Sequence, residues 1–217
     1  MKNQKFLIIG VVALSLAVFI FGANYYRKME NESRASQNSV LPDNSLLIKD
    51  TSPSIGPSIA KVTLVEFLDP ECESCRMMHP VIKNILKDYE NKIRYVLRYM
   101  PFHANSAIAA SWLEATRDQN KFWESLDILF LKQPEWGDHH SPKPELIPQF
   151  LKEIGVDIES ANIARSNPEI QARIEQDKKD GLALGVGGTP TYFVNGHMLL
   201  ELGEFQLKGL INEELAK

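Results

Sequence analysis

Two cysteines, Cys72 and Cys75, are the residues whose types and spacing point most directly to chemistry. They are the only cysteines among the 217 residues, and Glu73 and Ser74 separate them. Thiols at this spacing can close a small disulfide, and a thiol at a helix N-terminus is favoured as its thiolate by unpaired backbone amides. The pattern predicts redox chemistry, with Cys72 as the nucleophile and Cys75 as the resolving thiol that releases a mixed disulfide.

A structural zinc site and inert packing are the other uses of such a cysteine pair. Zinc needs four ligands, and the chain has no second CxxC motif or Cys/His pair at a matching spacing. Two inert thiols would be ordinary in the cytosol, but an exported chain meets an oxidising compartment in which the pair is oxidised or used. The sequence therefore favours catalysis, and no metal is expected.

The elements that hold the cysteines are predicted to form a β-α-β unit. Residues 61–68 are rich in apolar and β-branched side chains and end at a turn, which is typical of a buried strand. Apolar residues recur at three- and four-residue steps over 72–89, which predicts a helix that Pro80 should kink. Residues 93–99 alternate and predict a second strand, parallel to the first.

The rest of the chain predicts a helical insertion followed by a hairpin and a last helix. Four helices are expected in the segments 104–117, 121–131, 144–154 and 168–184. Residues 191–194 and 197–200 flank the Asn195-Gly196 dipeptide, a pattern that predicts a β-hairpin, and a helix should follow at 203–215. The expected fold class is α/β, with the order β-α-β, helical insertion, β-β-α.

Three further residues fit redox exchange. Glu66 lies six residues before Cys72 in an otherwise apolar strand. Burial there would raise its pKa and let it take the proton of Cys75, whereas an outward-facing strand position is the alternative. Pro190 begins a predicted strand, where proline occupies an edge or a turn with a cis or trans bond. A cis bond would let Thr189 present its backbone to an extended substrate peptide.

The N-terminal residues predict an export and anchoring segment. Residues 6–23 carry no charge and, at about 1.5 Å per residue in a helix, reach across most of a bilayer core. Phe21 stands where signal cleavage would need a small residue, and an aromatic and basic flank follows, so an uncleaved anchor is expected over 1–28. Residues 29–57 predict a linker with one edge strand, and 58–217 the folded domain.

Composition excludes several classes of protein. The chain is 44% apolar and 24% charged, so it is neither a disordered tail nor a low-complexity fibre. Its formal net charge of -4 leaves no basic surplus to neutralise a phosphate backbone. No nucleic-acid partner is therefore expected.

Taken together, the motifs resemble the active-site region of thioredoxin-fold proteins. Residues 65–80 combine an acidic residue six before the first cysteine with a proline five after the second. Similarity to the DsbA-like branch is carried by residues 100–103, 107–110, 121–124 and 185–196. The resemblance covers about 58–217 and places the helical insertion at about 103–184.

This resemblance implies a membrane-anchored thiol-disulfide oxidoreductase in the periplasm or extracytoplasmic space of a bacterium. It implies attack by Cys72, resolution by Cys75, and a cis Pro190 that binds substrate together with Thr189. The implied partners are substrate proteins with thiols or disulfides, a membrane redox partner, and the inner or cytoplasmic membrane, reached through the N-terminal helix. No cofactor is implied.

Departures from the DsbA-like pattern bear on the direction of the reaction. Glu73-Ser74 stands where strongly oxidising members have Pro-His, so a thiolate-stabilising histidine is missing. Three carboxylates also lie around Cys72, at Asp69, Glu71 and Glu73. Their charge should hold the pKa of Cys72 above that of the strongest oxidants. We expect a weaker oxidant than DsbA, working as an oxidase, a reductase or an isomerase.

Two other functions remain open from the sequence. The first is Cu(I) binding by the two thiols with help from Met77, Met78 or His79, because soft sulfur ligands select that ion. The helical spacing argues against it, since it turns Met78 inward and leaves His79 on the helix surface. The second is a noncatalytic client-binding module. His139 and His140 lie in a polar loop and are expected to be solvated.

Overall fold

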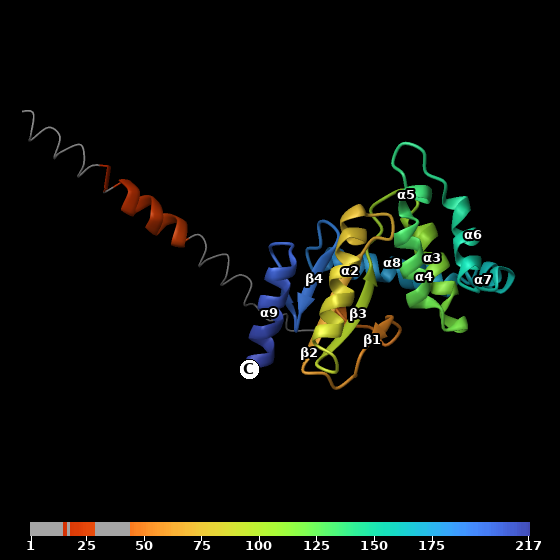
Figure 1. Cartoon of the computed structure of the whole chain (residues 1–217), viewed down its shortest axis with the longest axis horizontal. Coiled ribbons are helices and arrows are strands. Elements are labelled where there is room, and N and C mark those ends of the chain that lie inside the picture. Colours follow the sequence, from red (N-terminus) through yellow and green to blue (C-terminus); the bar gives the residue numbers. More distant parts are fainter. Residues whose placement is uncertain (1–14, 17, 29–43) are drawn as a thin grey trace, which may run out of the picture. The chain divides into compact units, whose positions relative to one another are not determined.

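The structure is a computed structural model that describes residues 15, 16, 18–28 and 44–217. The chain divides into two units, residues 1–40 and residues 41–217. In the first unit the described residues are helical (Figure 1). Most of the predicted anchor, and residues 29–43 of the predicted linker, lie outside the described residues. In the part of the chain that is described, no helix has the length and apolar character needed to cross a membrane.

A five-stranded sheet in the order β1-β3-β2-β4-β5 forms the centre of the second unit (Figure 1). Its strands are β1 (Ser54–Ile55), β2 (Val62–Leu68), β3 (Ile93–Tyr99), β4 (Thr191–Val194) and β5 (His197–Met198). The central strands β2 and β3 are parallel, and the other neighbouring pairs are antiparallel. The predicted α/β thioredoxin fold class is confirmed, although the second hairpin strand is shorter than expected.

The helices follow the predicted order, with two additions inside the insertion. They are α2 (Glu73–Asp88), α3 (Ser106–Ala115), α4 (Phe122–Leu131), α5 (Gln133–Trp136), α6 (Ile147–Glu153), α7 (Ile158–Ala164), α8 (Pro168–Ala183) and α9 (Glu204–Ala216). Single 3-10 turns are present at Asn44–Leu46, Arg117–Gln119 and Pro144–Leu146. The four-residue α5 is too short to show helical periodicity, and the seven-residue α7 was also not predicted.

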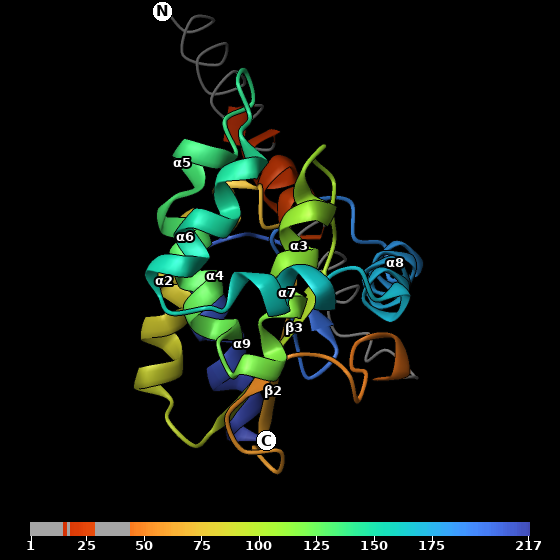
Figure 2. The same ribbon diagram turned by 90° about the vertical axis from the view of Figure 1, so that its right-hand side faces the viewer.

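Apolar side chains cover both faces of the sheet, as expected for parallel central strands. On one face, Leu64 and Tyr95 pack in a cluster with residues of α2 and α9. On the other face, Val65 and Phe67 pack with residues that adjoin α8. Gly181 lets α8 come close to this face, since a Cβ there would lie 3.0 Å from the Phe67 ring. A third cluster fills the helical insertion, whose helices α3, α4, α6 and α7 lie together in Figure 2.

Part of the predicted linker belongs to the folded unit. Leu47 is buried in the core, and β1 pairs with the edge of β3. Leu97 N also donates a hydrogen bond to Pro53 O at 2.9 Å. Residues 44–57 are therefore packed structure and not a tether, and they contain the two-residue edge strand β1.

The hairpin between β4 and β5 forms as its sequence predicted. Asn195 and Gly196 have φ values of 48° and 89°, the left-handed conformations that a tight hairpin turn requires. The Asn195 side chain accepts a hydrogen bond from Thr63 N at 2.8 Å. This contact ties the turn to the beginning of β2 and keeps β4 in register beside it.

Candidate functional site

The turn between β2 and α2 places both cysteines at the start of the helix. Cys72 is the N-cap residue of α2, and Cys75 lies one turn inside. Cys72 N donates to Asp69 O at 3.1 Å, and the Asp69 carboxylate accepts from Glu71 N at 2.8 Å. No side chain caps the helix, so the amides of its first turn remain available to the sulfur of Cys72.

The two thiols differ in acidity, although both are free and buried. Hydrogen bonds from the Cys75 side chain, from Thr189 and from the first-turn amides lower the pKa of Cys72 to about 5, against the opposing effect of burial. Burial, together with the hydrogen bond to Cys72, raises the pKa of Cys75 well above its ordinary value. At neutral pH, Cys72 is therefore a thiolate and Cys75 retains its proton.

The loop before β4 lies against Cys72. The Thr189–Pro190 peptide bond is cis, in agreement with the expectation for this proline. In its thiol form, Cys72 Sγ donates to Thr189 O at 3.3 Å, across 117 positions of sequence. Cys72, Thr189 and Pro190, singled out separately in the sequence, are thus brought together at one place.

Glu66 lies beneath this surface, on the face of β2 that α2 covers. It is 2% exposed, so the outward-facing alternative does not apply. Burial raises its pKa to about 7, while hydrogen bonds from Tyr95 and Tyr192 lower it. The charge of Glu66 in turn helps to raise the pKa of Cys75, which places the two groups within electrostatic reach of each other.

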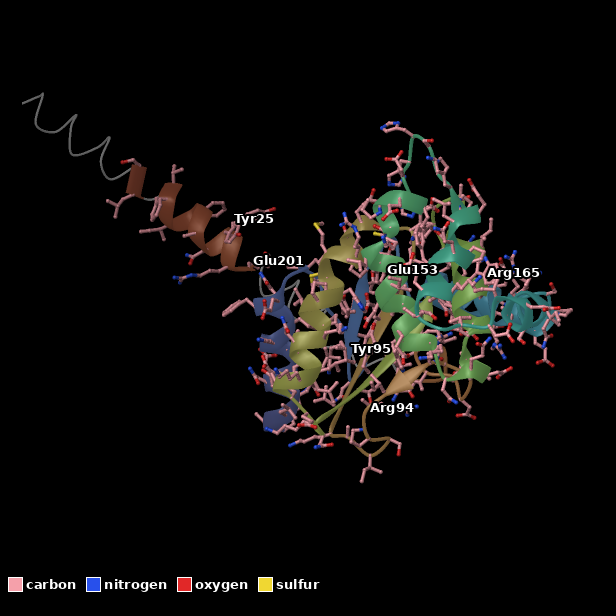
Figure 3. The ribbon with its side chains drawn as sticks, turned by 45° about the vertical axis from the view of Figure 1, so that its right-hand side comes forward. Tyr25, Arg94, Tyr95, Glu153, Arg165 and Glu201 are labelled. Carbon is pink, nitrogen blue, oxygen red and sulfur yellow. The ribbon has the colours of Figure 1, made fainter. Side chains whose placement is uncertain are left out.

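Tyr95 and Tyr192 are site residues that the sequence analysis missed. The Tyr192 hydroxyl donates to Glu66 Oε1 at 3.0 Å, and the Tyr95 hydroxyl donates to Oε2. Tyr95, labelled in Figure 3, comes from β3 and Tyr192 from β4. Each is a buried-face tyrosine in a predicted strand, but a partner for its hydroxyl could be assigned only once the strand register was known.

Gln133 of α5 is a second residue that the sequence did not indicate. Its Nε2 donates to the carbonyl oxygens of Pro70 and Cys72 at 2.9 and 3.0 Å. Its Oε1 accepts from Arg76 Nε at 2.9 Å. A single buried amide therefore joins the helical insertion to the turn that carries the nucleophile.

Asp69 and Glu71 bind the beginning of α3 and do not face Cys72 as unpaired charges. Asp69 accepts hydrogen bonds from His103 Nδ1 at 2.7 Å and from Ser106 Oγ at 2.5 Å. Glu71 accepts from the backbone and side-chain nitrogens of Asn105 at 2.7 and 2.8 Å. Both carboxylates are fully enclosed and hold the turn to the insertion.

The third carboxylate, Glu73, pairs with His139 of the loop that follows α5. The two side chains are 2.7 Å apart, and His139 holds the pKa of Glu73 below its ordinary value. Burial is the main effect that opposes ionisation of Cys72, and no carboxylate is among the principal groups that shift its pKa. The three carboxylates are thus not the main restraint on Cys72 that the sequence analysis expected. His139 is exposed to solvent, as expected, and pairs with Glu73.

The side chains considered for Cu(I) binding are spread over different surroundings. Met77 is exposed, and Met78 packs against the core under α2. His79 does not lie free on the helix surface, because its Nε2 is 2.6 Å from Asp127 Oδ1 of α4. Across residues 15, 16, 18–28 and 44–217, no group of three or more His, Cys, Asp or Glu side chains is arranged to hold a metal ion.

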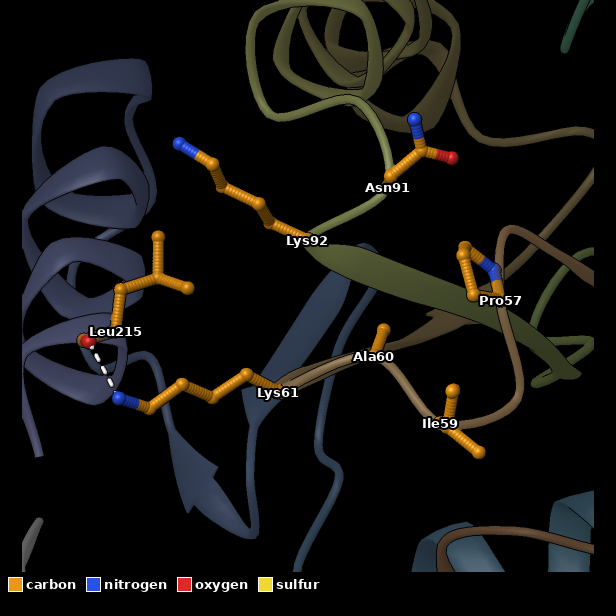
Figure 4. Close-up of a pocket in the computed structure, with 7 residues that line it drawn as sticks. All are labelled: Pro57, Ile59, Ala60, Lys61, Asn91, Lys92 and Leu215. Carbon is orange, nitrogen blue, oxygen red and sulfur yellow. Dashed lines mark hydrogen bonds between the residues drawn. The ribbon is translucent and has the colours of Figure 1, made fainter.

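Of two pockets among the described residues, one adjoins the candidate site and the other lies away from it. One, of about 300 Å³, adjoins the CxxC turn and is lined by residues that include Glu73, Arg76, Gln133 and His139. A larger one, of about 530 Å³, lies beyond the opposite end of β2 (Figure 4). There Lys61 Nζ donates to Leu215 O at 2.7 Å, and no candidate site residue lines the pocket.

Comparison with known proteins identifies related folds. Residues 49–213 match the protein family described as Thioredoxin. A thioredoxin-like oxidoreductase from Silicibacter pomeroyi DSS-3 is 26% identical with a TM-score of 0.70, covering 82% of this chain and 99% of that chain. The thiol-disulfide exchange protein alpha-DsbA2 from Wolbachia pipientis is 23% identical with a TM-score of 0.70, covering 84% and 97%, and it supports the fold alone. The expected enzyme class agrees with these names.

Similar segments also occur in larger proteins. The Na(+)/H(+) antiporter NhaA of Herminiimonas arsenicoxydans is 33% identical over 144 residues, which are 66% of this chain and 22% of the antiporter. The antiporter NhaA 3 of Salinispora tropica is 33% identical over 144 residues, with 65% and 21% covered. This chain spans about a fifth of the length of these curated relatives.

Proposed function

Because the chain belongs to the thioredoxin family, we propose that it is a thiol-disulfide oxidoreductase that exchanges disulfides with substrate proteins through Cys72 and Cys75. The difference between the two thiols carries the proposal. Cys72 has a pKa of about 5, whereas burial raises the pKa of Cys75 well above its ordinary value. An ionised nucleophile beside a protonated resolving thiol is the arrangement that stepwise exchange requires.

In the reducing direction the reaction has two steps. The Cys72 thiolate attacks a substrate disulfide, a bond forms between Cys72 and one substrate sulfur, and the other substrate sulfur leaves as a thiolate. Cys75 then gives its proton to the Glu66 carboxylate, and its sulfur attacks Cys72. The bond between Cys72 and the substrate breaks, the second substrate sulfur leaves with its electron pair, and the Cys72–Cys75 disulfide remains.

The oxidising direction is the reverse of this sequence. A substrate thiolate attacks Cys72 of the Cys72–Cys75 disulfide, and Cys75 leaves as a thiolate that takes the proton of Glu66. A second substrate thiolate then attacks the substrate sulfur bound to Cys72, the substrate disulfide forms, and Cys72 leaves as a thiolate. A pKa of about 5 for Cys72 lies between the values of about 3.5 and about 7 for DsbA and thioredoxin. A less stabilised thiolate corresponds to a less oxidising disulfide, so we propose a weaker oxidant than DsbA.

Location and partners complete the proposal. Residues 1–28 anchor the protein in the inner or cytoplasmic membrane of a bacterium, with the domain in the extracytoplasmic space. The uncharged stretch over 6–23 supports this assignment. The pair of thiols is returned to its working redox state by a membrane redox partner. Thr189 and Pro190, which lie beside Cys72, contact the substrate peptide.

Equilibration of the full-length protein in detergent with glutathione buffers tests the proposal. We expect a reversible Cys72–Cys75 disulfide with a potential between about -120 mV and about -270 mV, the values of DsbA and thioredoxin. Cys72→Ala should abolish exchange, and Cys75→Ala should accumulate a mixed disulfide with substrate. Ser58→Ala, an exposed position before β2, serves as the control and should exchange as the wild type does. A wild-type protein that formed no reversible disulfide would overturn the proposal.

A further inference from the structure

The surroundings of Glu66 are unusual for a buried carboxylate. Its two oxygens accept hydrogen bonds from two different tyrosines, Tyr95 and Tyr192, both buried. Among the described residues that shift its ionisation there is no Lys, Arg or His; only these tyrosines and Cys72 contribute besides burial. Neutral donors stabilise the carboxylate form without fixing its charge as a cation would.

Strand register explains why both hydroxyls reach the same group. Tyr192 is the direct cross-strand partner of Glu66 in the antiparallel β2–β4 pair. Tyr95 pairs with Leu64 in the parallel β2–β3 ladder, two residues before the partner of Glu66, and therefore shares its face. The tyrosines approach from the two neighbouring strands, so each carboxylate oxygen receives its own donor.

We propose that Tyr95 and Tyr192 are positioning residues, whose hydroxyls hold the Glu66 carboxylate in place and stabilise its charged form so that it can accept the proton of Cys75. The inference rests on the proposed function and extends it to the two residues that bind the proton acceptor. Glu66 takes the proton of Cys75 as the Cys75 sulfur attacks Cys72. The tyrosines keep their own protons throughout, because burial and the charge of Glu66 raise the pKa of both.

Tyr95→Phe and Tyr192→Phe test this role, because each removes one donor and keeps the ring. The Tyr95 ring packs against Trp123 with centroids 5.7 Å apart, a contact that phenylalanine preserves. Tyr99→Phe is the matched control. Tyr99 is also a buried tyrosine of β3 and donates to a buried carboxylate, Glu114, at 3.1 Å, but in the helical insertion.

Two measurements on the full-length reduced protein in detergent separate an effect of the hydroxyls on Glu66 ionisation from an effect on core packing. The first is a ¹³C-NMR titration of glutamate carboxyl carbons, with Glu66→Gln identifying the Glu66 signal. We expect each Phe variant to raise the Glu66 midpoint by about one pH unit, the effect of losing one hydrogen bond to a charged group. The second is the rate at which the mixed disulfide with a disulfide peptide is resolved, measured against pH. This rate should fall at low pH, where Glu66 is protonated, and the midpoint of the fall should move upward by the same amount.

The outcomes are distinguishable. An unmoved Glu66 midpoint in Tyr95→Phe and Tyr192→Phe would overturn the inference while leaving the proposed function intact. The inference would also be overturned if the Glu66 midpoint moved while the low-pH fall in the resolution rate stayed in place. An equal change in Tyr99→Phe would overturn it as well. Should one variant fail to fold, the other still decides the question. Failure of the wild-type protein to form a reversible disulfide would instead overturn the proposed function, and the inference with it.

Discussion

Two buried carboxylate sites lie on opposite faces of the same sheet, and β3 contributes to both. On one face Tyr95 donates to Glu66. On the other, Arg98 is completely buried and binds Asp177 and Asp180 of α8 at 2.7 and 2.6 Å. The first site contains hydroxyl donors and the second a guanidinium, although Tyr95 and Arg98 lie only three residues apart on β3.

This difference separates a titratable carboxylate from a structural one. Burial raises the pKa of Glu66 to about 7, because neutral hydroxyls offset only part of the desolvation. Burial also disfavours charge on Asp180, but hydrogen bonds from Arg98 and Lys49 outweigh it and lower the pKa of that group. Burial prevails at Asp177, whose pKa is raised. A guanidinium thus serves to bind α8 to β3, whereas hydroxyls leave Glu66 able to exchange a proton near neutral pH.

The largest expected effect comes from removing the buried guanidinium. Arg98→Met should lower the free energy of unfolding by about 3–5 kcal/mol, because it leaves buried Asp177 without its cation and leaves Asp180 with Lys49 alone. Urea denaturation measures this loss. Arg94→Met, on the same strand but only partly buried, is the control and should change stability by about 0.5 kcal/mol or less. Equal effects of the two substitutions would show that the buried network is not structural.

The next effect is the contribution of Glu66 to the pH dependence of the free energy of unfolding. The pKa of Glu66 is raised from 4.5 to about 7, so the folded state keeps a proton that the unfolded chain releases, and stability falls as pH rises through this window. Glu66→Gln should abolish this fall. Relative to wild type, the variant should gain about 3 kcal/mol of stability between pH 4 and pH 8. Parallel stability curves for the two reduced proteins would contradict the assignment.

The smallest effect is expected at the exposed pair of Glu73 and His139. Both side chains are nearly half exposed, so solvent screens their interaction. His139→Ala should leave the free energy of unfolding unchanged and raise the pKa of Glu73 toward its ordinary value, since His139 is the main cause of its depression. NMR titration of the Glu73 carboxyl carbon measures this. A Glu73 midpoint that stayed in place would show that other donors hold it.

Which parts of the site could be predicted depends on how far apart in the sequence the interacting residues lie. Cys72 and Cys75 could be placed at a helix start because the strand, the turn and the helical periodicity are all local patterns. Glu66 could be singled out because it interrupts an apolar strand, but the strand pattern left open whether it faces inward or outward. Gln133 could not be assigned, because it reaches Cys72 across 61 positions from a helix of only four residues. Likewise, nothing local indicates that Leu47 belongs to the core.

The sequence by itself determined the CxxC motif at a helix N-terminus, the β-α-β and hairpin elements, and the fold class. Only the tertiary structure decided which groups set the acidity of the Glu66 carboxylate and of Cys72. Tyr192 is 126 positions away from Glu66, and Thr189 is 117 positions away from Cys72. Local periodicity fixes which face a side chain takes, but strand register and helix packing fix its neighbours, and pKa values depend on those neighbours.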